Sequence, residues 1–322
     1  KRGSEPLLEK EKLISNSYLY KYSEIKMSKI LITGGLGFVG NNLVRHLLQN
    51  GNDKIVVLDN LSTSKYNNRV RSPRVEYVIG STVDIETKFS DRNFDKVFHF
   101  GEYSRIATSF DDIDRVLEYN QTGTANVLKF CVKKNSKLIY SATSSSFGYS
   151  DDMNPYSWTK SKNIELIKNF GKWFGLRYEI CYFYNVYGPG QIEKGPYSTV
   201  VGIFERLKRE GKPLTIVSPG TQTRDFTHVS DIVNGVVKAS NLERRGEYYL
   251  RSGKVVSIIN LAAMFGGEVK IVPERRGERF STLEMRDDDK TREILDWEPK
   301  IELNEYVSKL EGKEHVFSDF VI

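Results

Sequence analysis

A tyrosine and a lysine in the middle of the chain have the spacing of a proton-transferring pair. Tyr156 and Lys160 are four residues apart in the run PYSWTK, which starts at Pro155 and continues into a helical pattern. Residues four apart lie one turn from each other on the same face of a helix. A cationic ammonium beside a phenol favours the phenolate, which is the form a base needs near neutral pH. The same spacing also arises by chance on solvated helix faces, so the pair indicates catalysis only together with other motifs of the chain.

A glycine-rich turn near residue 34 has the context of a dinucleotide site. The apolar run 30–33 is followed by GGLGFVG, with glycines at 34, 37 and 40, and then by a helical pattern. Such a turn lets a pyrophosphate approach the N-terminus of the helix. Asp59 ends the next apolar run, where a carboxylate accepts hydrogen bonds from the adenine ribose and repels the 2'-phosphate of NADP. These features predict an NAD site, and a structural turn with a surface aspartate is the alternative.

Short apolar runs alternate with helical patterns from Lys29 onward, which is typical of a doubly wound parallel sheet. We therefore predict an α/β fold: a Rossmann-type sheet with a smaller α/β substrate-binding C-terminal domain. Residues 1–26 are interpreted as a tail, or alternatively as an arm that packs on a partner subunit. The NAD-binding domain is expected over 27–184 and the sugar-nucleotide domain mainly over 185–322, with a crossover back near 226–250. The predicted strands are 30–33, 55–58, 75–79, 96–100, 138–141 and 178–183, and the predicted helices include 41–49 and 163–170.

Charge and composition exclude several classes of function. The 48 basic and 42 acidic residues give a net charge of +6 without a long block of like charges, so no nucleic-acid partner is expected. The two cysteines, Cys131 and Cys181, lie in apolar runs, which predicts a reducing compartment and a cytoplasmic protein. We expect no membrane span, since no apolar run approaches about 20 residues, and no metal site.

From Met27 onward the sequence resembles the extended short-chain dehydrogenase/reductase family, most closely the nucleotide-sugar 4-epimerases of the UDP-glucose 4-epimerase type. The matching motifs, in chain order, are ITGGLGFVG (32–40), LDNLST (58–63), VFHFG (97–101), NQTGTANVL (120–128), SATSSSFG (141–148), PYSWTK (155–160), NVYGPGQ (185–191) and QTRDFTHVSDIV (222–233).

The resemblance implies roles for individual residues in catalysis and NAD binding. Thr143 would hydrogen-bond the reacting sugar hydroxyl and form a catalytic trio with Tyr156 and Lys160, and Lys160 would also hold the nicotinamide ribose. The adenine contact would fall on Asp84 and Ile85. The NAD-binding positions implied are Gly34, Gly37, Phe38, Val39, Gly40, Asp59, Asn60, Ser62, Asp84, Ile85, Phe100, Gly101, Asn120, Ser141, Tyr156 and Lys160.

The resemblance also implies a binding site for the sugar diphosphate. Asn185, Arg224 and Arg275 map onto it, and the fork of an arginine suits phosphate oxygens. For Arg224 the alternative is a surface salt bridge to Asp225 or Asp231, and the neighbouring arginines make the register at Arg275 ambiguous. The predicted substrate-binding residues are Glu102, Ser104, Arg105, Thr143, Asn185, Val217, Arg224 and Arg275.

Three departures from the family pattern bear on the substrate. Ser144 and Ser145 stand where the dehydratases carry Asp-Glu and the decarboxylases a Glu, and a serine cannot serve as acid and base at ordinary pH. The loop 102–105 is bulky and charged instead of small, which suggests a sugar with extra hydroxyls or a charged substituent, unless these side chains pack against the first helix. Val217 replaces an aromatic residue that stacks on the base, so GDP- and dTDP-sugars stay open beside UDP-sugars.

The predicted reaction follows from these assignments. Tyr156 as phenolate takes the proton of the C4 hydroxyl while the hydride passes to NAD⁺, giving a 4-keto sugar. Return of the hydride to the other face makes the enzyme a 4-epimerase. Net oxidation would make it a C4 dehydrogenase of an unusual sugar such as a heptose, and a non-catalytic NAD(H) sensor or scaffold is the third alternative. A homodimer is predicted through the segments 111–133 and 161–174.

Overall fold

A central parallel sheet organises the protein. The computed structural model describes residues 27–147, 154–278, 280 and 288–310, so the predicted tail 1–26 lies outside it. In this part of the chain the sheet has seven strands in the order β10-β6-β5-β4-β1-β2-β3, and all neighbours are parallel. This arrangement confirms the predicted doubly wound Rossmann-type fold. The strands are β1 (Lys29–Thr33), β2 (Lys54–Asp59), β3 (Val75–Ile79), β4 (Lys96–His99), β5 (Lys137–Thr143), β6 (Tyr178–Phe183) and β10 (Glu247–Leu250).

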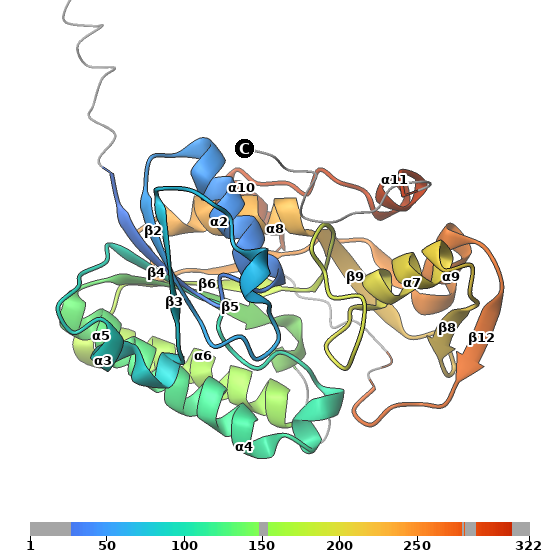
Figure 1. The fold of residues 1–322 in the computed structure, drawn as a ribbon, viewed down its shortest axis with the longest axis horizontal. Helices are drawn as coiled ribbons and strands as arrows, with labels where there is room; N and C mark the ends of the chain where they lie inside the picture. Colours follow the sequence, from blue (N-terminus) through green and yellow to red (C-terminus); the bar gives the residue numbers. More distant parts are fainter. Residues whose placement is uncertain (1–26, 148–153, 279, 281–287, 311–322) are drawn as a thin grey trace, which may run out of the picture.

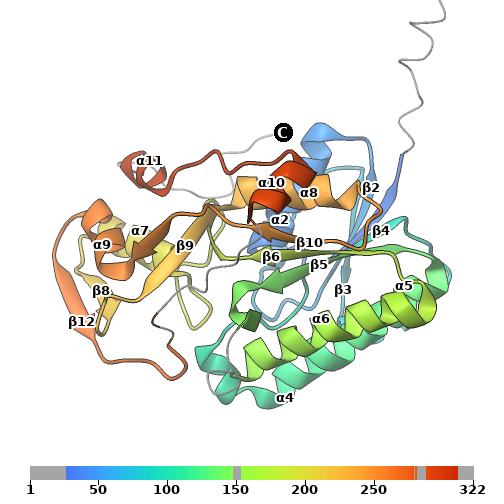
Figure 2. The same cartoon turned by 180° about the vertical axis from the view of Figure 1, so that it is seen from behind.

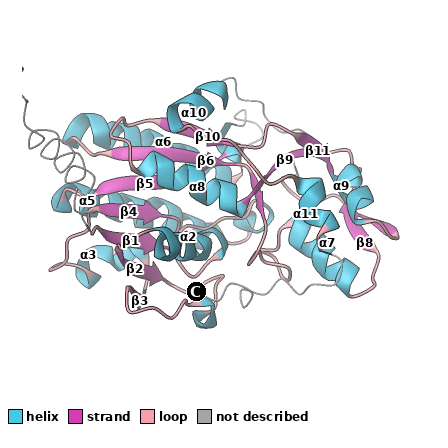
Figure 3. Ribbon diagram, turned by 90° about the horizontal axis from the view of Figure 1, so that it is seen from above, coloured by secondary structure: helices cyan, strands magenta, loops and turns pink. Residues whose placement is uncertain are grey.

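Helices cover both faces of this sheet (Figures 1 and 3). Successive residues of a strand point to opposite faces. Ile30 and Ile32 of β1 therefore enter one core, and Leu31 enters the other. The first core lies against α2 (Phe38–Asn50), α8 (Val229–Ser240) and α10 (Asp288–Leu295), and the second against α3 (Ile85–Lys88), α5 (Thr124–Lys134) and α6 (Pro155–Phe174).

The C-terminal part builds a second region beside the carboxyl ends of the strands (Figure 2). A three-stranded sheet has the order β11-β9-β7, and β8 pairs with β12. The apolar sides of three helices close a separate core around Phe204, Ile216 and Leu261. The elements are β7 (Asn185–Tyr187), α7 (Val200–Arg209), β8 (Leu214–Val217), β9 (Thr223–His228), β11 (Val255–Ser257), α9 (Ile258–Phe265), β12 (Val269–Val272) and α11 (Leu303–Ser308).

The chain passes between the two regions more than once. After β9 it returns to the first region, where α8 covers the sheet and β10 pairs with β6, with Glu247 opposite Ile180. The predicted crossover covers these elements, whereas the boundary at residue 184 remains a prediction. The short helical segments are Tyr66–Asn68, Thr82–Asp84, Ala107–Phe110, α4 (Ile113–Val116), the π-helical turn Leu117–Gly123 and Ser144–Phe147. None of the helices in the described residues is long and apolar enough to cross a membrane.

Candidate active site

The glycine turn between β1 and α2 opens the N-terminus of α2 toward a pocket of about 520 Å³. Gly34 has φ +70°, and a Cβ there would lie 2.8 Å from the backbone nitrogen of Gly101. A Cβ at Gly40 would overlap the carbonyl oxygen of Gly34. At Gly37, the N-cap of α2, a Cβ would meet only this oxygen, at 3.3 Å. The turn is thus tight on its inner side and open at Gly37, as a bound pyrophosphate requires.

Asp59 anchors the neighbouring wall of the pocket at the end of β2. Its side chain accepts hydrogen bonds from the backbone N–H of Leu36 and of Leu61, both at 2.9 Å, and from the Ser64 hydroxyl at 2.8 Å. A carboxylate has about four acceptor positions, so capacity remains for a ribose hydroxyl. Asn60 and Ser62 line the pocket beside it. This donor and acceptor set fits the adenosine half of NAD.

A buried histidine connects β4 to the glycine turn. The Thr33 hydroxyl oxygen accepts hydrogen bonds from the backbone N–H of Phe100 and Gly101, and it lies 2.8 Å from His99 Nδ1. Burial lowers the pKa of His99 to about 4, so the ring is neutral at neutral pH. Since Thr33 uses its own proton toward Nδ1, Nε2 carries the hydrogen of His99 and donates to the Thr124 hydroxyl at 2.9 Å.

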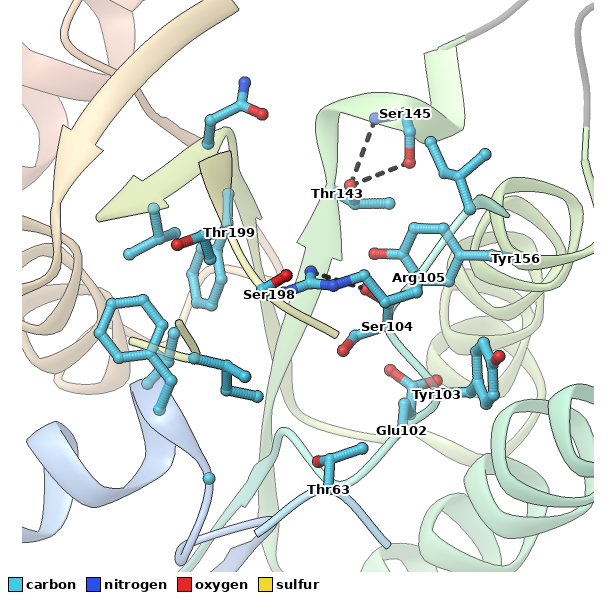
Figure 4. Close-up of a pocket in the computed structure, with 18 of the residues that line it drawn as sticks. Thr63, Glu102, Tyr103, Ser104, Arg105, Thr143, Ser145, Tyr156, Ser198 and Thr199 are labelled. Carbon is cyan, nitrogen blue, oxygen red and sulfur yellow. Dashed lines mark hydrogen bonds between the residues drawn. The ribbon is translucent and has the colours of Figure 1, made fainter. Parts of the chain in front are cut away.

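The three predicted catalytic residues line one pocket (Figure 4). Thr143 is the last residue of β5, and Tyr156 and Lys160 lie in the first turns of α6. This helix starts where its sequence predicts, at Pro155, and the Asn154 side chain caps it by accepting from the Ser157 N–H at 2.9 Å. The Tyr156 hydroxyl points into the pocket on the side of Thr143 (Figure 4).

Glu102 lines the pocket on the side of Lys160. Its carboxylate forms a buried ion pair with Lys160 and accepts hydrogen bonds from Thr124, Tyr140 and Asn163. A buried carboxylate needs a cation and hydrogen-bond donors, and these neighbours supply both. Its predicted contact with the sugar remains a prediction.

The rest of this loop divides between the interior and the pocket. Tyr103 turns inward, with its hydroxyl donating to Thr108 at 2.6 Å, and thus packs against the segment 107–112 rather than against the first helix. Ser104 and Arg105 remain in the pocket wall. The Arg105 guanidinium donates to the Tyr197 carbonyl oxygen, and burial lowers its pKa while Tyr156 opposes this shift. Arg105 therefore lies within electrostatic reach of the Tyr156 hydroxyl.

The residues predicted to bind the sugar diphosphate line the same pocket: Asn185 from β7, Arg224 from β9 and Arg275 from the loop after β12. Val217 of β8, at the predicted base-stacking position, lines it too. Arg224 pairs with Glu278 at 2.6 Å. The alternative predicted for Arg224, a salt bridge to Asp225 or Asp231, is wrong. Asp225 pairs with Arg251 at 3.0 Å, and the Asp231 carboxylate accepts backbone N–H groups of Lys300 and Ile301.

Three predicted NAD-binding residues lie outside the pocket lining. Asp84 is exposed and Ile85 is fully buried, whereas Gly80 and Thr82 form the wall there. Asp84 ends the helical turn Thr82–Asp84, and the adenine contact assigned to Asp84 and Ile85 remains a prediction. Asn120 is also fully buried: its side chain accepts from the Tyr103 N–H at 2.7 Å and donates to the Thr159 hydroxyl at 3.0 Å. It joins the loop 102–105 to α6.

Several pocket residues escaped the sequence analysis. Ser198 and Thr199 face the catalytic side across the pocket (Figure 4), and Thr199 caps α7 by accepting from the Gly202 N–H at 3.0 Å. The run STVVGIF carries the signal of a helix cap, although nothing in it indicates a ligand. The other unpredicted lining residues include Thr63, Tyr119, Tyr184, Ile192 and Glu278.

This geometry defines a class of protein, namely a Rossmann-type enzyme with a tyrosine and lysine pair beside its dinucleotide turn. Residues 30–250 match the model of the NAD dependent epimerase/dehydratase family. The match spans more than half of the chain, which therefore belongs to this family. NAD is its cofactor, and the resemblance found in the motifs is confirmed.

Individual relatives cover nearly the whole chain. A putative UDP-glucose 4-epimerase of Methanocaldococcus jannaschii is 28% identical over 302 residues, covering 87% of this chain and 96% of that protein. The UDP-glucuronic acid decarboxylase 6 of Arabidopsis thaliana is 27% identical, over 88% of each chain. The crystal structure of UDP-glucose 4-epimerase with UDP-glucose from Thermotoga maritima has a TM-score of 0.80 at 27% identity, covering 87% of this chain and 96% of that one. The protein is thus an NAD-dependent nucleotide-sugar enzyme of the epimerase, dehydratase or decarboxylase type.

Proposed function

We propose that this protein is a nucleotide-sugar 4-epimerase that acts through a 4-keto intermediate. One observation carries the proposal. Thr143, Tyr156 and Lys160 line one pocket, and the two residues after Thr143 are serines, without an acid and base for elimination or decarboxylation. These serines weigh against the other reactions of the family.

Two side chains act on the C4 oxygen of the sugar. Tyr156, as phenolate, takes the proton of the C4 hydroxyl, and Thr143 donates a hydrogen bond to the same oxygen. Ser145 restrains Thr143, because the two hydroxyl oxygens lie 3.0 Å apart. Lys160 holds a positive charge beside the phenolate. NAD held by the glycine turn and Asp59 would supply the acceptor and donor of the C4 hydride.

We assign the two halves of the pocket to the two ligands. The glycine turn, Asp59 and the wall at Gly80 and Thr82 would hold NAD, and Phe38, Val39, Phe100, Gly101 and Ser141 complete the lining on that side. Asn185 and the guanidinium groups of Arg224 and Arg275 would bind the diphosphate. The polar wall of Ser104, Arg105, Ser198 and Thr199 favours a sugar with extra hydroxyls or a charged substituent, such as a heptose.

Net oxidation at C4 is the alternative, because it shares the first half-reaction. Incubation of the purified protein and NAD with UDP-glucose, GDP-mannose and dTDP-glucose separates the two. Epimerisation gives the inverted sugar, detected by chromatography and mass spectrometry, without NADH absorbance. NADH in stoichiometric amount with the sugar would overturn the proposal in favour of the dehydrogenase. Binding of NAD without any conversion, including of heptose nucleotides, would favour a sensor.

We also propose a homodimer formed through α4, α5 and α6. Large apolar side chains are exposed on α4 (Ile113), on the π-helical turn that joins α4 to α5 (Leu117) and on α6 (Trp158, Trp173 and Phe174). Exposed apolar groups gathered on neighbouring elements are typical of interfaces. Light scattering at micromolar concentration is expected to give twice the chain mass, and a monomer would contradict the proposal. A cytoplasmic location also remains a prediction, although Cys131 and Cys181 are buried free thiols.

A further inference from the structure

Glu102 is a buried carboxylate directly behind the proposed catalytic lysine. The side chains of Glu102 and Lys160 are 3% and 4% exposed and form an ion pair. The other carboxylate oxygen of Glu102 accepts from the Thr124 hydroxyl at 2.9 Å, the Tyr140 hydroxyl at 3.0 Å and the Asn163 amide at 2.8 Å. Transfer of a carboxylate from water into the protein interior is costly unless a cation and hydrogen-bond donors compensate it. The arrangement is therefore specific for an acidic residue.

The ammonium of Lys160 is fixed by its surroundings. It donates to Glu102 and to the Ser141 carbonyl oxygen, and it lies 4.4 Å from the centre of the Tyr140 ring. An ammonium has three N–H donors, so one remains for the pocket, where Tyr156 lies one helical turn away. Lys160 is thus oriented before any ligand binds.

The charge of Glu102 changes what Lys160 does to Tyr156. A lone ammonium stabilises a neighbouring phenolate, and a carboxylate paired with that ammonium from behind weakens this stabilisation without removing it. We propose that Glu102 is a positioning residue that holds Lys160 and partly offsets the charge that Lys160 presents to Tyr156.

Other ionisable groups around the pair do not replace this effect. His99 lies behind Thr124 and is neutral, since burial lowers its pKa to about 4. Burial and Glu102 raise the pKa of Tyr140 well above its usual value, so this phenol stays protonated. Arg105 interacts electrostatically with Tyr156 and is left unchanged in every variant below. Glu102 is thus the counter-charge that substitution can remove selectively.

The test is a spectroscopic titration of Tyr156. Phenolate absorbance is followed against pH in the NAD-saturated protein, and subtraction of the Tyr156→Phe signal isolates the contribution of Tyr156. Glu102→Gln removes the charge and keeps the size of the side chain. We expect the Tyr156 midpoint to fall by about one pH unit, the order of magnitude for a nearby unit charge at an effective dielectric of about 20. An unchanged or raised midpoint would overturn the inference.

Further variants separate charge from packing. Glu102→Asp keeps the charge and is expected to restore the midpoint of the unsubstituted protein, whereas a midpoint as low as that of Glu102→Gln would show that shape is responsible and refute the role of charge. If Glu102→Gln does not fold, Glu102→Ala removes the same charge and is expected to give the same lowering. Glu179→Gln is the matched control, because Glu179 is also buried and paired to a lysine, Lys137 at 3.2 Å, near the amino ends of the strands. The Tyr156 midpoint is expected to stay unchanged in Glu179→Gln. A fall as large as that in Glu102→Gln would refute a local effect of Glu102.

Kinetics provide the second readout, and this readout alone rests on the proposed function. The acidic limb of the kcat profile reports the base in the complex, so it is expected to move to lower pH in Glu102→Gln. A lowered spectroscopic midpoint in a protein that converts no sugar nucleotide would remove the proposed function and leave the role of Glu102 standing. Conversion of a sugar nucleotide, with the same Tyr156 midpoint in Glu102→Gln and in the unsubstituted protein, would support the proposed function and refute the role of Glu102.

Discussion

The hydroxyl oxygens of Thr143 and Ser145 lie 3.0 Å apart, and the backbone N–H of Ser145 also points to the Thr143 oxygen at 3.3 Å. Thr143 is the last residue of β5, and Ser145 lies in the following helical turn, so this contact fixes the Thr143 side chain in the pocket wall. Ser145 therefore supports Thr143, and its hydroxyl cannot serve as an acid or base at ordinary pH.

The first prediction concerns this pair. Thr143→Val keeps the shape but removes the hydroxyl, and we expect kcat to fall by about 10- to 100-fold, the value of one hydrogen bond to a charged oxygen. Ser145→Ala is expected to lower kcat less, because it only loosens Thr143. Rates are measured with the sugar nucleotide that the protein converts, and Thr143→Ser is the control that keeps the hydroxyl. Equal rates for Thr143→Val and the unsubstituted protein would exclude Thr143 from the reaction.

Arg224 is expected to contribute to binding and little to the chemical step. Arg224→Met removes a guanidinium from the proposed diphosphate site, so KM is predicted to rise by about 10- to 100-fold with kcat nearly unchanged. Arg209→Met is a matched control, since Arg209 pairs with Glu193 on the surface at 2.5 Å and does not line the pocket. A fall in kcat at constant KM would place Arg224 elsewhere in the mechanism.

Two glycines of the dinucleotide turn are expected to respond differently to alanine. The Cβ of Gly40→Ala would overlap the Gly34 carbonyl, so we predict a lower Tm together with loss of NAD binding. At Gly37 the nearest atom would be 3.3 Å away, and Gly37→Ala is expected to weaken NAD binding with a smaller change in Tm. Thermal unfolding and fluorescence titration with NAD measure both effects. Tight NAD binding by Gly37→Ala would show that the pyrophosphate lies elsewhere.

Glu205 makes stability depend on pH. Burial raises the pKa of Glu205 from its usual 4.5 to about 7, against the hydrogen bonds from Tyr306 and Gln191. The unfolded chain therefore releases this proton at lower pH than the folded one. The contribution of Glu205 to stability is complete below about pH 4.5 and declines as the pH rises through 7.

Glu205→Gln removes this titration and keeps an oxygen that can accept from Tyr306. Relative to the unsubstituted protein, the variant is expected to gain about 2 to 3 kcal/mol in free energy of unfolding between about pH 5 and pH 8. Urea unfolding at both pH values provides the measurement. An equal difference in free energy of unfolding between Glu205→Gln and the unsubstituted protein at both pH values would contradict the raised pKa of Glu205.

Local patterns predicted most of the fold and part of the site. The glycines at 34, 37 and 40, Asp59 and the Tyr156–Lys160 pair could be found because each belongs to one element whose context is visible in the sequence. The edge strand β10 was covered only by a predicted crossover, since EYYL is a short run and its partner β6 lies more than sixty residues earlier.

The sequence could not predict side-chain direction or register where these depend on distant residues. Glu102 comes after β4, and its carboxylate is oriented by Lys160, Tyr140 and Asn163, which belong to β5 and α6. Asp84 and Ile85 were assigned from the resemblance, as an aspartate followed by an aliphatic residue after the third strand, whereas Gly80 and Thr82 line the pocket there. Ser198 and Thr199 belong to a loop whose approach to the pocket only the folded chain reveals.

The central claim is that the C4 hydrogen leaves and returns on the same sugar. The most direct test uses UDP-glucose, GDP-mannose and dTDP-glucose carrying deuterium at C4, with Tyr156→Phe as the inactive control. We predict that the sugar nucleotide accepted by the protein is inverted at C4 with its deuterium retained, and that nothing is exchanged from solvent. Loss of the C4 deuterium during inversion, or solvent hydrogen incorporated at C5, would contradict the account.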